Sequence, residues 1–404
     1  MMKSKRKIVL AYSGGLDTSI IIHWLKQKYD ADVIAVCIDV GQGQELNGLK
    51  QKALKSGASK AYIINAAKEF VVDYIFPCIK AGAVYENKYF LGTSIARPII
   101  AKKVVEVARK EDAWALSHGA TGKGNDQVRF ELVFKALAPE LKIIAPWREW
   151  ELKSRKDEIE YAKRFKIPVA ITKEKPYSSD KNIWHISYEG GILEDTANHP
   201  KEDMFELTVS PEKAPDKPEI IEIGFKKGIP VTLNNKLLDP VVLLHTLNKI
   251  GGRNGIGRVD LVENRLVGMK SRGVYESPAA AILYTAHNEL ENLVLDRDSF
   301  RMKQYLSVKY SELVYYGLWH STLREALDKF FGVLQENVEG VVKLKLYKGN
   351  CIIYGRESKK SLYWQELATF EEDNLFNQYD AEGFINLFGL PTKIAALKRK
   401  DRRM

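Results

Sequence analysis

Apolar residues in the first part of the chain alternate between short continuous runs and longer helical repeats. The continuous runs have the length and uniformity of strands that are buried on both faces, and they occupy residues 8–10, 33–40, 61–64, 113–116 and 143–145. Apolar residues at helical spacing lie between them, at residues 20–25, 46–56, 70–79, 98–109 and 128–137. This alternation predicts an α/β fold, with right-handed βαβ units and a parallel sheet covered by helices on both faces.

The pattern changes after residue 168. Residues 176–218 are rich in Pro, Ser, Asp and Lys and contain few periodic apolar runs. Farther along, the apolar positions predict two hairpins and three helices, at residues 221–233, 341–354, 241–249, 279–295 and 323–335. The second half is therefore expected to form a separate α+β domain.

These changes predict three parts: a parallel-sheet domain over residues 1–170, an α+β domain over 171–369 and a helical tail over 370–404. A chain of 404 residues is long enough to bury a large core. No apolar run approaches the roughly 20 residues that a membrane helix needs. We therefore expect no membrane partner.

A polar segment with two glycines follows the first predicted strand directly. It consists of Ala11, Tyr12, Ser13, Gly14, Gly15, Leu16, Asp17, Thr18 and Ser19. The glycines allow a tight turn, and the helix behind them directs free N–H groups and the positive end of its dipole to the same point. The hydroxyl groups add hydrogen-bond donors, and Asp17 adds a carboxylate that suits a hydrated magnesium ion. The segment predicts a site for a polyphosphate with Mg²⁺.

The spacing of these glycines differs from two common nucleotide-binding motifs. The Gly-x-x-x-x-Gly-Lys-Ser/Thr pattern of a Walker A loop is missing, and so is the Gly-x-Gly-x-x-Gly pattern of a dinucleotide fold. Ser-Gly-Gly-x-Asp after a buried strand instead resembles the pyrophosphate loop of the N-type ATP pyrophosphatases. Members of that superfamily split ATP into AMP and pyrophosphate to activate an oxygen of a second substrate.

Residues 117–129 form a second unusual polar segment, located where the fourth predicted strand ends. It contains three glycines within six residues, and Asn125 or Asp126 is placed to cap the helix that follows. Its hydroxyl, amide, carboxylate and guanidinium groups suit an amino acid, which needs donors for its carboxylate and an acceptor for its ammonium group. Arg129 lies about one turn into the helix and suits bidentate pairing with a carboxylate. The alternative interpretation is an ordinary capped loop.

Three other polar residues have a simple structural interpretation from the sequence alone. Ser94 precedes a predicted helix and is expected to be its N-cap. Glu263 is expected to form an ion pair with Arg265 or Arg272. His185 has the chemistry of a base, although a hydrogen-bonded structural histidine is the simpler expectation.

The net charge of +10 raises the question of nucleic-acid binding. Four of these charges lie within the first seven residues and a net four within the last seven, so the body of the chain is nearly neutral. We therefore expect no nucleic-acid partner. The three cysteines, Cys37, Cys78 and Cys351, are too far apart for a metal knuckle or a disulfide framework, which favours the cytoplasm.

Segments spread over nearly the whole chain resemble the argininosuccinate synthase family. The most specific is SHGATGKGNDQVRFE from Ser117, and the others are AYSGGLDTS from Ala11, LGTS from Leu91, HISYE from His185 and VENRLVGMKSRGVYE from Val262. The resemblance implies a ligase of arginine biosynthesis that condenses citrulline with aspartate through a citrullyl-adenylate intermediate. It also implies that ATP is consumed, that Mg²⁺ is required and that the protein is a homotetramer.

The same resemblance implies a role for individual residues. Residues 11–19 and Gly119 would bind ATP, with the backbone of Ile38 near the adenine. The residues that would hold citrulline are Tyr89, Ser94, Arg129, Ser178, Ser187, Glu263 and Tyr275. The residues that would hold aspartate are Thr121, Asn125 and Asp126, and Asn125 would touch both substrates. The catalytic roles would fall to Asp17, as the magnesium ligand, and to Asp126, beside the aspartate amine.

Other functions remain alternatives at this point. A tRNA-modifying ATP pyrophosphatase often uses paired cysteines and an RNA-binding module, and the sequence suggests neither. A glutamine-dependent synthetase would have a nucleophilic cysteine where Met2 stands. A nucleotide sensor with the same core would leave residues 117–129 and the second domain without a purpose.

Overall fold

The computed structural model describes residues 5–168, 177–369 and 375–401. They belong to two compact units, Met1–Lys360 and Ser361–Met404, which are described separately. The expected boundary between residues 170 and 171 lies outside the described residues, as do residue 370 and the charges of Lys3, Arg402 and Arg403. The division into three parts stays a prediction.

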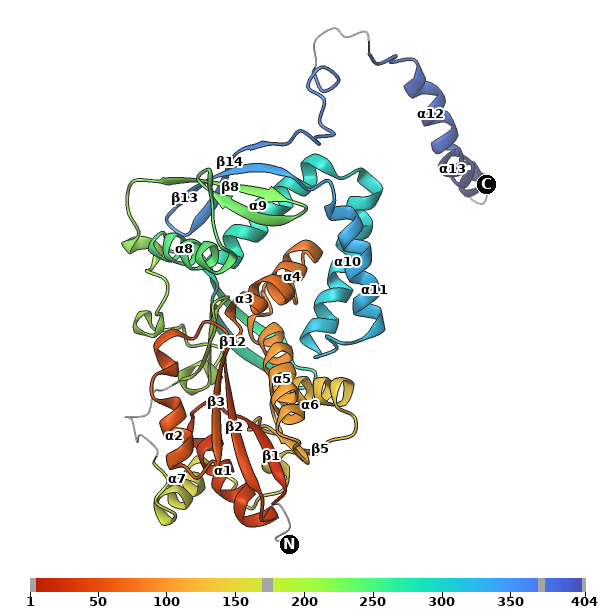
Figure 1. Cartoon of the computed structure of the whole chain (residues 1–404). Helices are drawn as coiled ribbons and strands as arrows, with labels where there is room; N and C mark the ends of the chain where they lie inside the picture. The colour runs from red at the N-terminus through yellow and green to blue at the C-terminus, as the bar shows by residue number, and fades with distance from the viewer. Residues whose placement is uncertain (1–4, 169–176, 370–374, 402–404) are drawn as a thin grey trace. The chain divides into compact units, whose positions relative to one another are not determined.

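A five-stranded parallel sheet forms the N-terminal part of the first unit (Figure 1). Its order is β3-β2-β1-β4-β5, and its strands are β1 (Lys7–Ala11), β2 (Asp32–Asp39), β3 (Lys60–Asn65), β4 (Ala115–Ser117) and β5 (Lys142–Ile144). The central strand β1 is buried on both faces, because Ile8 and Leu10 pack into one apolar cluster and Val9 into another. The predicted α/β class and parallel sheet are confirmed.

Helices cover both faces of this sheet, as the apolar pattern predicted. One cluster contains residues of α1 (Leu16–Tyr29), α2 (Leu49–Lys55) and α7 (Arg155–Arg164). The other contains residues of α5 (Gly92–Lys110) and α6 (Asp126–Leu137). The helix expected at residues 70–79 is a succession of three short pieces, which are α3 (Ala67–Phe70), the π-helical turn η2 (Val71–Ile75) and α4 (Phe76–Ala81).

Two antiparallel sheets follow in the same unit. The first has the order β10-β9-β8-β13-β14 and contains both predicted hairpins; its strands are β8 (Glu219–Lys226), β9 (Ile229–Leu233), β10 (Lys236–Leu237), β13 (Gly340–Tyr347) and β14 (Asn350–Glu357). The second has the order β11-β12-β7-β6, with strands β6 (Ser178–Lys181), β7 (Ile186–Glu189), β11 (Arg258–Asn264) and β12 (Lys270–Glu276). The second sheet carries much of the candidate site and was not predicted.

Four helices complete the first unit: α8 (Pro240–Arg253), α9 (Pro278–Val294), α10 (Arg297–Tyr315) and α11 (Thr322–Gln335). The pattern of the sequence predicts all of them except α10. Only a few of the 19 residues of α10 are buried, and most of these lie in its last two turns, so it lacks the continuous apolar stripe of a typical packed helix. Asp296 nevertheless caps it by accepting hydrogen bonds from the backbone N–H groups of Asp298 and Ser299.

A buried carboxylate fixes the end of β12, next to Tyr275. Glu276 is fully buried and accepts hydrogen bonds from the backbone N–H groups of residues 206–208, from the hydroxyl of Thr208 and from that of Tyr188. A buried charge is tolerated only when it is paired or fully hydrogen-bonded, and five donors satisfy this condition. The end of the strand is therefore held firmly in place.

The described residues of the second unit form two helices, α12 (Asp380–Phe388) and α13 (Leu390–Asp401). Large apolar side chains on α12 are exposed, among them Phe384, Ile385, Leu387 and Phe388. Across the described residues, no helix is both long and apolar enough to span a membrane.

Candidate functional site

Two polar loops meet at the carboxyl edge of the parallel sheet. Residues 11–19 follow β1, and residues 117–125 follow β4, which pairs with β1. A Cβ atom added to Gly119 would lie 2.8 Å from Cγ2 of Thr18, so the two loops are in direct contact. Ligands of parallel sheets bind at this edge, and the contact joins the two polar segments into one site.

The loop after β1 has the geometry of an anion cradle. Gly14 has a φ of 80°, a left-handed conformation that favours glycine. The Ser13 hydroxyl accepts a hydrogen bond from the N–H of Gly15 (3.3 Å) and lies 3.2 Å from the Thr18 hydroxyl. Helix α1 begins behind Gly15, which has no side chain to cap it. The first N–H groups of α1 are thus available to an anion.

Two neighbouring elements complete the surroundings of this loop. Lys52 of α2 donates a hydrogen bond to the carbonyl of Gly14, and burial lowers the pKa of its ammonium group. The sequence did not single out Lys52, because it lies among several lysines. Ile38 is buried in β2, and its carbonyl accepts a hydrogen bond from the side-chain amide of Gln42 (2.7 Å).

Asp17 lies in the first turn of α1 and is hydrogen-bonded to Glu158 of α7. Glu158 is 3% exposed, and its Oε1 has no hydrogen-bond partner among the described residues. Burial raises the pKa of both carboxyl groups, and the negative charge of Asp17 raises the pKa of Glu158 further. Ionisation of both carboxyl groups together is therefore disfavoured. No local pattern marks this contact, which joins positions 141 residues apart.

A polar cavity of about 290 Å³ lies beside the two loops. Most of the predicted substrate residues line it, together with one predicted ATP residue: Tyr89, Gly119, Thr121, Asn125, Asp126, Arg129, Ser178, Ser187, Glu263 and Tyr275. Strand register brings three lining residues into one row, since Asp180 of β6 pairs with Ser187 of β7, which pairs with Tyr275 of β12. The cavity is therefore built jointly by the parallel sheet's loops and the second antiparallel sheet.

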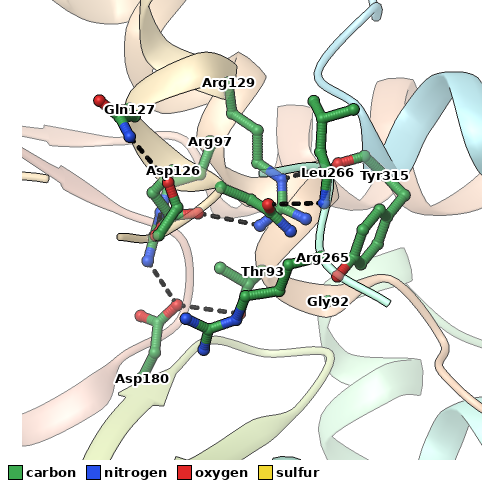
Figure 2. A network of polar contacts seen from close by, with 12 residues as sticks. Gly92, Thr93, Arg97, Asp126, Gln127, Arg129, Asp180, Arg265, Leu266 and Tyr315 are labelled. Carbon is green, nitrogen blue, oxygen red and sulfur yellow. Dashed lines mark hydrogen bonds and ion pairs between the residues drawn. The ribbon is translucent and has the colours of Figure 1, made fainter. Parts of the chain in front are cut away.

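Asp126 is held between two arginines (Figure 2). Its Oδ2 accepts a hydrogen bond from Nε of Arg97 (2.8 Å), and its Oδ1 accepts one from Nη1 of Arg129 (2.9 Å). Burial opposes ionisation of this carboxyl group, but the two positive charges outweigh burial and lower its pKa. Arg97 also donates through Nη2 to Asp180 (2.6 Å), which ties α5 and α6 to β6.

Arg129 presents an unused donor. Its Nε donates to the carbonyl of Tyr315 (3.0 Å), while its Nη2 is buried and has no hydrogen-bond partner among the described residues. The guanidinium carbon lies 4.9 Å from the centre of the Tyr315 ring. A buried unpaired N–H group is costly, so this atom suits a ligand carboxylate.

Glu263 presents the complementary acceptor. The expected ion pair is wrong, because Arg265 and Arg272 pair with other carboxylates. Glu263 instead accepts a hydrogen bond from the Tyr275 hydroxyl (3.1 Å), and its Oε2 is buried without a partner among the described residues. Burial raises the pKa of Glu263, and the charge of Arg129 opposes this shift. The free oxygen suits a ligand ammonium group.

The expected capping roles of three residues are wrong. Helix α6 begins after Asn125 without a side-chain cap, because Asn125 accepts a hydrogen bond from the N–H of Leu266 (3.0 Å) and Asp126 binds the two arginines. Helix α5 begins at Gly92, so Ser94 is its third residue rather than its N-cap. Ser94 is fully buried and does not line the cavity.

Several lining residues escaped the sequence analysis: Thr93, Arg97, Asp180, Glu189, Arg265 and Tyr315. Thr93 and Arg97 lie in or just after the LGTS segment and are four residues apart, so they share one face of α5. That spacing was the available signal. Tyr315 ends α10, which the sequence analysis missed, and no local feature marks it.

Comparisons with known proteins agree along the whole chain. It matches the descriptions "Arginosuccinate synthase N-terminal HUP domain" over residues 7–168 and "Arginosuccinate synthase C-terminal domain" over residues 177–395. It is 64% identical to an argininosuccinate synthase of Endomicrobium trichonymphae, covering 98% of this chain and 96% of that protein. It is 62% identical to one of Caldanaerobacter subterraneus, covering 100% and 98% respectively.

A solved structure, the U34-tRNA thiolase NcsA of Methanococcus maripaludis, matches part of the chain. The identity is 17%, the TM-score is 0.27, and the match covers 43% of this chain and 62% of that one. The similarity is too low to support any inference about this chain.

The contact between Asp17 and Glu158 predicts a pH-dependent stability. Between the ordinary pKa of a glutamate, about 4.3, and the raised pKa of Glu158, the folded protein holds a proton that the unfolded chain has released. Stability from this group therefore falls as the pH rises through that interval. Glu158→Gln removes the titration and keeps a hydrogen-bond donor for Asp17. We expect the variant to melt about 1–2 °C higher than the parent at pH 9, because the unfolding entropy grows with chain length and about 1 kcal/mol shifts the melting temperature of 404 residues by only about 1 °C.

The measurement is calorimetric melting at pH 5 and pH 9 with a chelator present. Glu160→Gln, on the exposed face of the same helix, is the matched control and should leave the melting temperature unchanged at both pH values. An equal shift of the Glu158 variant at pH 5 and pH 9 would contradict the proton between the two carboxyl groups.

Proposed function

The chain belongs to the argininosuccinate synthase family, and on that premise we propose which residues hold each reactant. The protein is an ATP-dependent ligase that condenses citrulline with aspartate through a citrullyl-adenylate, releasing AMP and pyrophosphate. One observation carries the assignment of residues. A single cavity, next to the loop after β1, contains both the free donor of Arg129 and the free acceptor of Glu263.

ATP binds at the carboxyl edge of the parallel sheet in this proposal. Residues 11–19 hold the triphosphate through backbone N–H groups and hydroxyls, with the N-terminus of α1 directed at it. Gly119 closes the site from the neighbouring loop, since it contacts Thr18. The backbone of Ile38, at the carboxyl end of β2, lies near the adenine.

The surroundings of Asp17 fit a divalent cation. The neighbouring Glu158 has a buried carboxylate oxygen without a partner among the described residues, and the raised pKa of both carboxyl groups shows that a positive charge between them would be favourable. Asp17 is the proposed ligand of Mg²⁺. Bound there, the ion would neutralise charge that develops on the departing pyrophosphate.

Citrulline occupies the inner part of the cavity. Its α-carboxylate pairs with Nη2 of Arg129 and its ammonium group with Oε2 of Glu263, because both atoms are buried and unsatisfied and belong to side chains of opposite charge. The remaining predicted contacts are Tyr89, Ser94, Ser178, Ser187 and Tyr275. Ser94 is fully buried, so its part is to support Tyr89 and the start of α5 rather than to face the cavity.

Aspartate lies nearer the loop after β4, on Thr121, Asn125 and Asp126. Asp126 accepts a hydrogen bond from the ammonium group of aspartate, and Asn125 lies between the two substrates. The chemistry needs no protein nucleophile. The ureido oxygen attacks the α-phosphate of ATP, and the amine of aspartate then attacks the activated carbon, so positioning and charge stabilisation supply most of the acceleration.

The family also suggests a homotetramer in the cytoplasm. The exposed apolar side chains of α12 support a contact between subunits, since such residues are normally covered. Sedimentation equilibrium measures this directly, and a species with the mass of one chain would contradict it.

The decisive assay is pyrophosphate release from ATP. We expect sustained release when citrulline and aspartate are both present, at most one equivalent per site with citrulline alone, and none with aspartate alone. Release that depends on tRNA instead of the amino acids would contradict the proposal.

The role of Arg129 predicts a large effect on citrulline binding. Removal of one partner from a buried ion pair costs roughly 3–5 kcal/mol, so Arg129→Ala should weaken citrulline binding by that amount. Calorimetric titration measures the affinity, and circular dichroism checks the fold. Arg356→Ala, which removes a half-exposed arginine of β14, is the control and should bind citrulline normally. Near-normal affinity of the Arg129 variant would refute the assignment.

The role of Asp17 predicts a loss of adenylation without a loss of fold. Asp17→Asn removes the charge that holds Mg²⁺, and pyrophosphate release should fall roughly 100-fold, as when a transition-state electrostatic group is lost. The exposed Asp298→Asn is the control. Unchanged release, with an intact thermal transition, would count against magnesium at this position.

A further inference from the structure

His185 lies just behind the cavity wall, between β6 and β7. It is 1% exposed and is not among the residues that line the cavity. Its ring is stacked 5.9 Å from the ring of Tyr275, and a Cβ atom on Gly92 would lie 2.3 Å from its Cγ. The ring is therefore fixed on both sides and has no direct route to a substrate.

The two polar contacts of the Thr93 hydroxyl determine the tautomer of His185. The hydroxyl of Thr93 lies 3.1 Å from Oδ2 of Asp180 and 3.1 Å from Nε2 of His185. A hydroxyl has one proton, and a carboxylate that is paired with Arg97 can only accept. The proton of Thr93 therefore goes to Asp180, and Nε2 of His185 must donate to Thr93.

The opposite nitrogen supports this assignment. Nδ1 of His185 is buried and has no hydrogen-bond partner among the described residues, as expected of the unprotonated nitrogen of a neutral ring facing the close approach of Gly92. Burial lowers the pKa of His185 to about 4, an effect that the charge of Asp180 opposes and that of Arg97 supports. The ring is thus neutral at physiological pH, with its proton on Nε2.

The hydrogen bond from His185 is the first in a continuous series. Thr93 receives it and donates to Asp180, which accepts from Arg97, which in turn holds Asp126 (Figure 2). We propose that His185 is a positioning residue for the aspartate side of the cavity, acting through the orientation of the Thr93 hydroxyl. This inference rests on the proposed placement of aspartate beside Asp126.

Two substitutions separate the hydrogen bond from simple packing. His185→Gln places an amide N–H near the position of Nε2, whereas His185→Met fills similar space without a donor. We expect the Met variant to raise the KM for aspartate roughly tenfold, the equivalent of one lost hydrogen bond in a charged network. The KM for citrulline should change less than about twofold, and the Gln variant should restore most of the aspartate KM.

A double-mutant cycle tests whether the effect passes through Thr93. In a Thr93→Val background, His185→Met should cause little further rise in the aspartate KM, because the hydroxyl that it orients is already gone. Fully additive effects, or equal losses in the Gln and Met variants, would overturn the positioning role.

A spectroscopic measurement is independent of substrate placement. In ¹⁵N spectra of histidine-labelled protein, with His185→Gln identifying the signal, we expect a protonated Nε2 and an unprotonated Nδ1 from pH 6 to pH 8. An Nδ1–H tautomer or an imidazolium ion would overturn the inference. A rise confined to the citrulline KM would overturn the aspartate-side role and show that aspartate lies elsewhere, while the spectrum alone would still decide the tautomer.

Discussion

The position of Asp126 between Arg97 and Arg129 is the constraint on which the rest of the site depends. It joins α5 to α6 at the loop after β4, and through Arg97 and Asp180 it reaches the second antiparallel sheet. A carboxylate between two buried cations keeps its charge, so the cavity retains a negative group at a fixed place. The parallel-sheet part of the first unit and its second antiparallel sheet are thereby held in a fixed arrangement around the cavity.

This constraint explains how one edge of a parallel sheet can serve three reactants. The loop after β1 uses backbone N–H groups and hydroxyls, which suit phosphates, whereas the loop after β4 uses charged side chains, which suit amino acids. Their contact at Gly119 and Thr18 brings the loop that suits phosphates next to the cavity that suits amino acids. An oxygen that must attack a phosphate and a carbon that must accept an amine can then share one small volume, so catalysis relies on proximity.

Much of the fold and of the phosphate loop could be predicted because their physical causes are local. A strand such as residues 8–10 shows its burial in its own composition, and the loop beyond it shows its turn in its glycines. The second antiparallel sheet could not be predicted, since its inward side chains include Ser187, Glu263 and Tyr275, which line a polar cavity rather than form an apolar stripe. The ion pair expected for Glu263 was wrong because its causes are not local. The two arginines near it in sequence pair with other carboxylates.

The unsatisfied atoms of the cavity suit a zwitterionic ligand. Nη2 of Arg129 and Oε2 of Glu263 are buried without partners among the described residues, a condition that costs stability in the free protein. The surrounding hydrogen bonds hold both atoms in place despite this cost: Arg129 donates to the Tyr315 carbonyl and to Asp126, and the Tyr275 hydroxyl donates to Glu263. A zwitterionic ligand can satisfy both atoms at once. Binding would then offset the cost in stability of leaving the two atoms without partners. Rigid, unsatisfied groups of opposite charge therefore suit the carboxylate and ammonium groups that an amino acid carries on a single carbon atom.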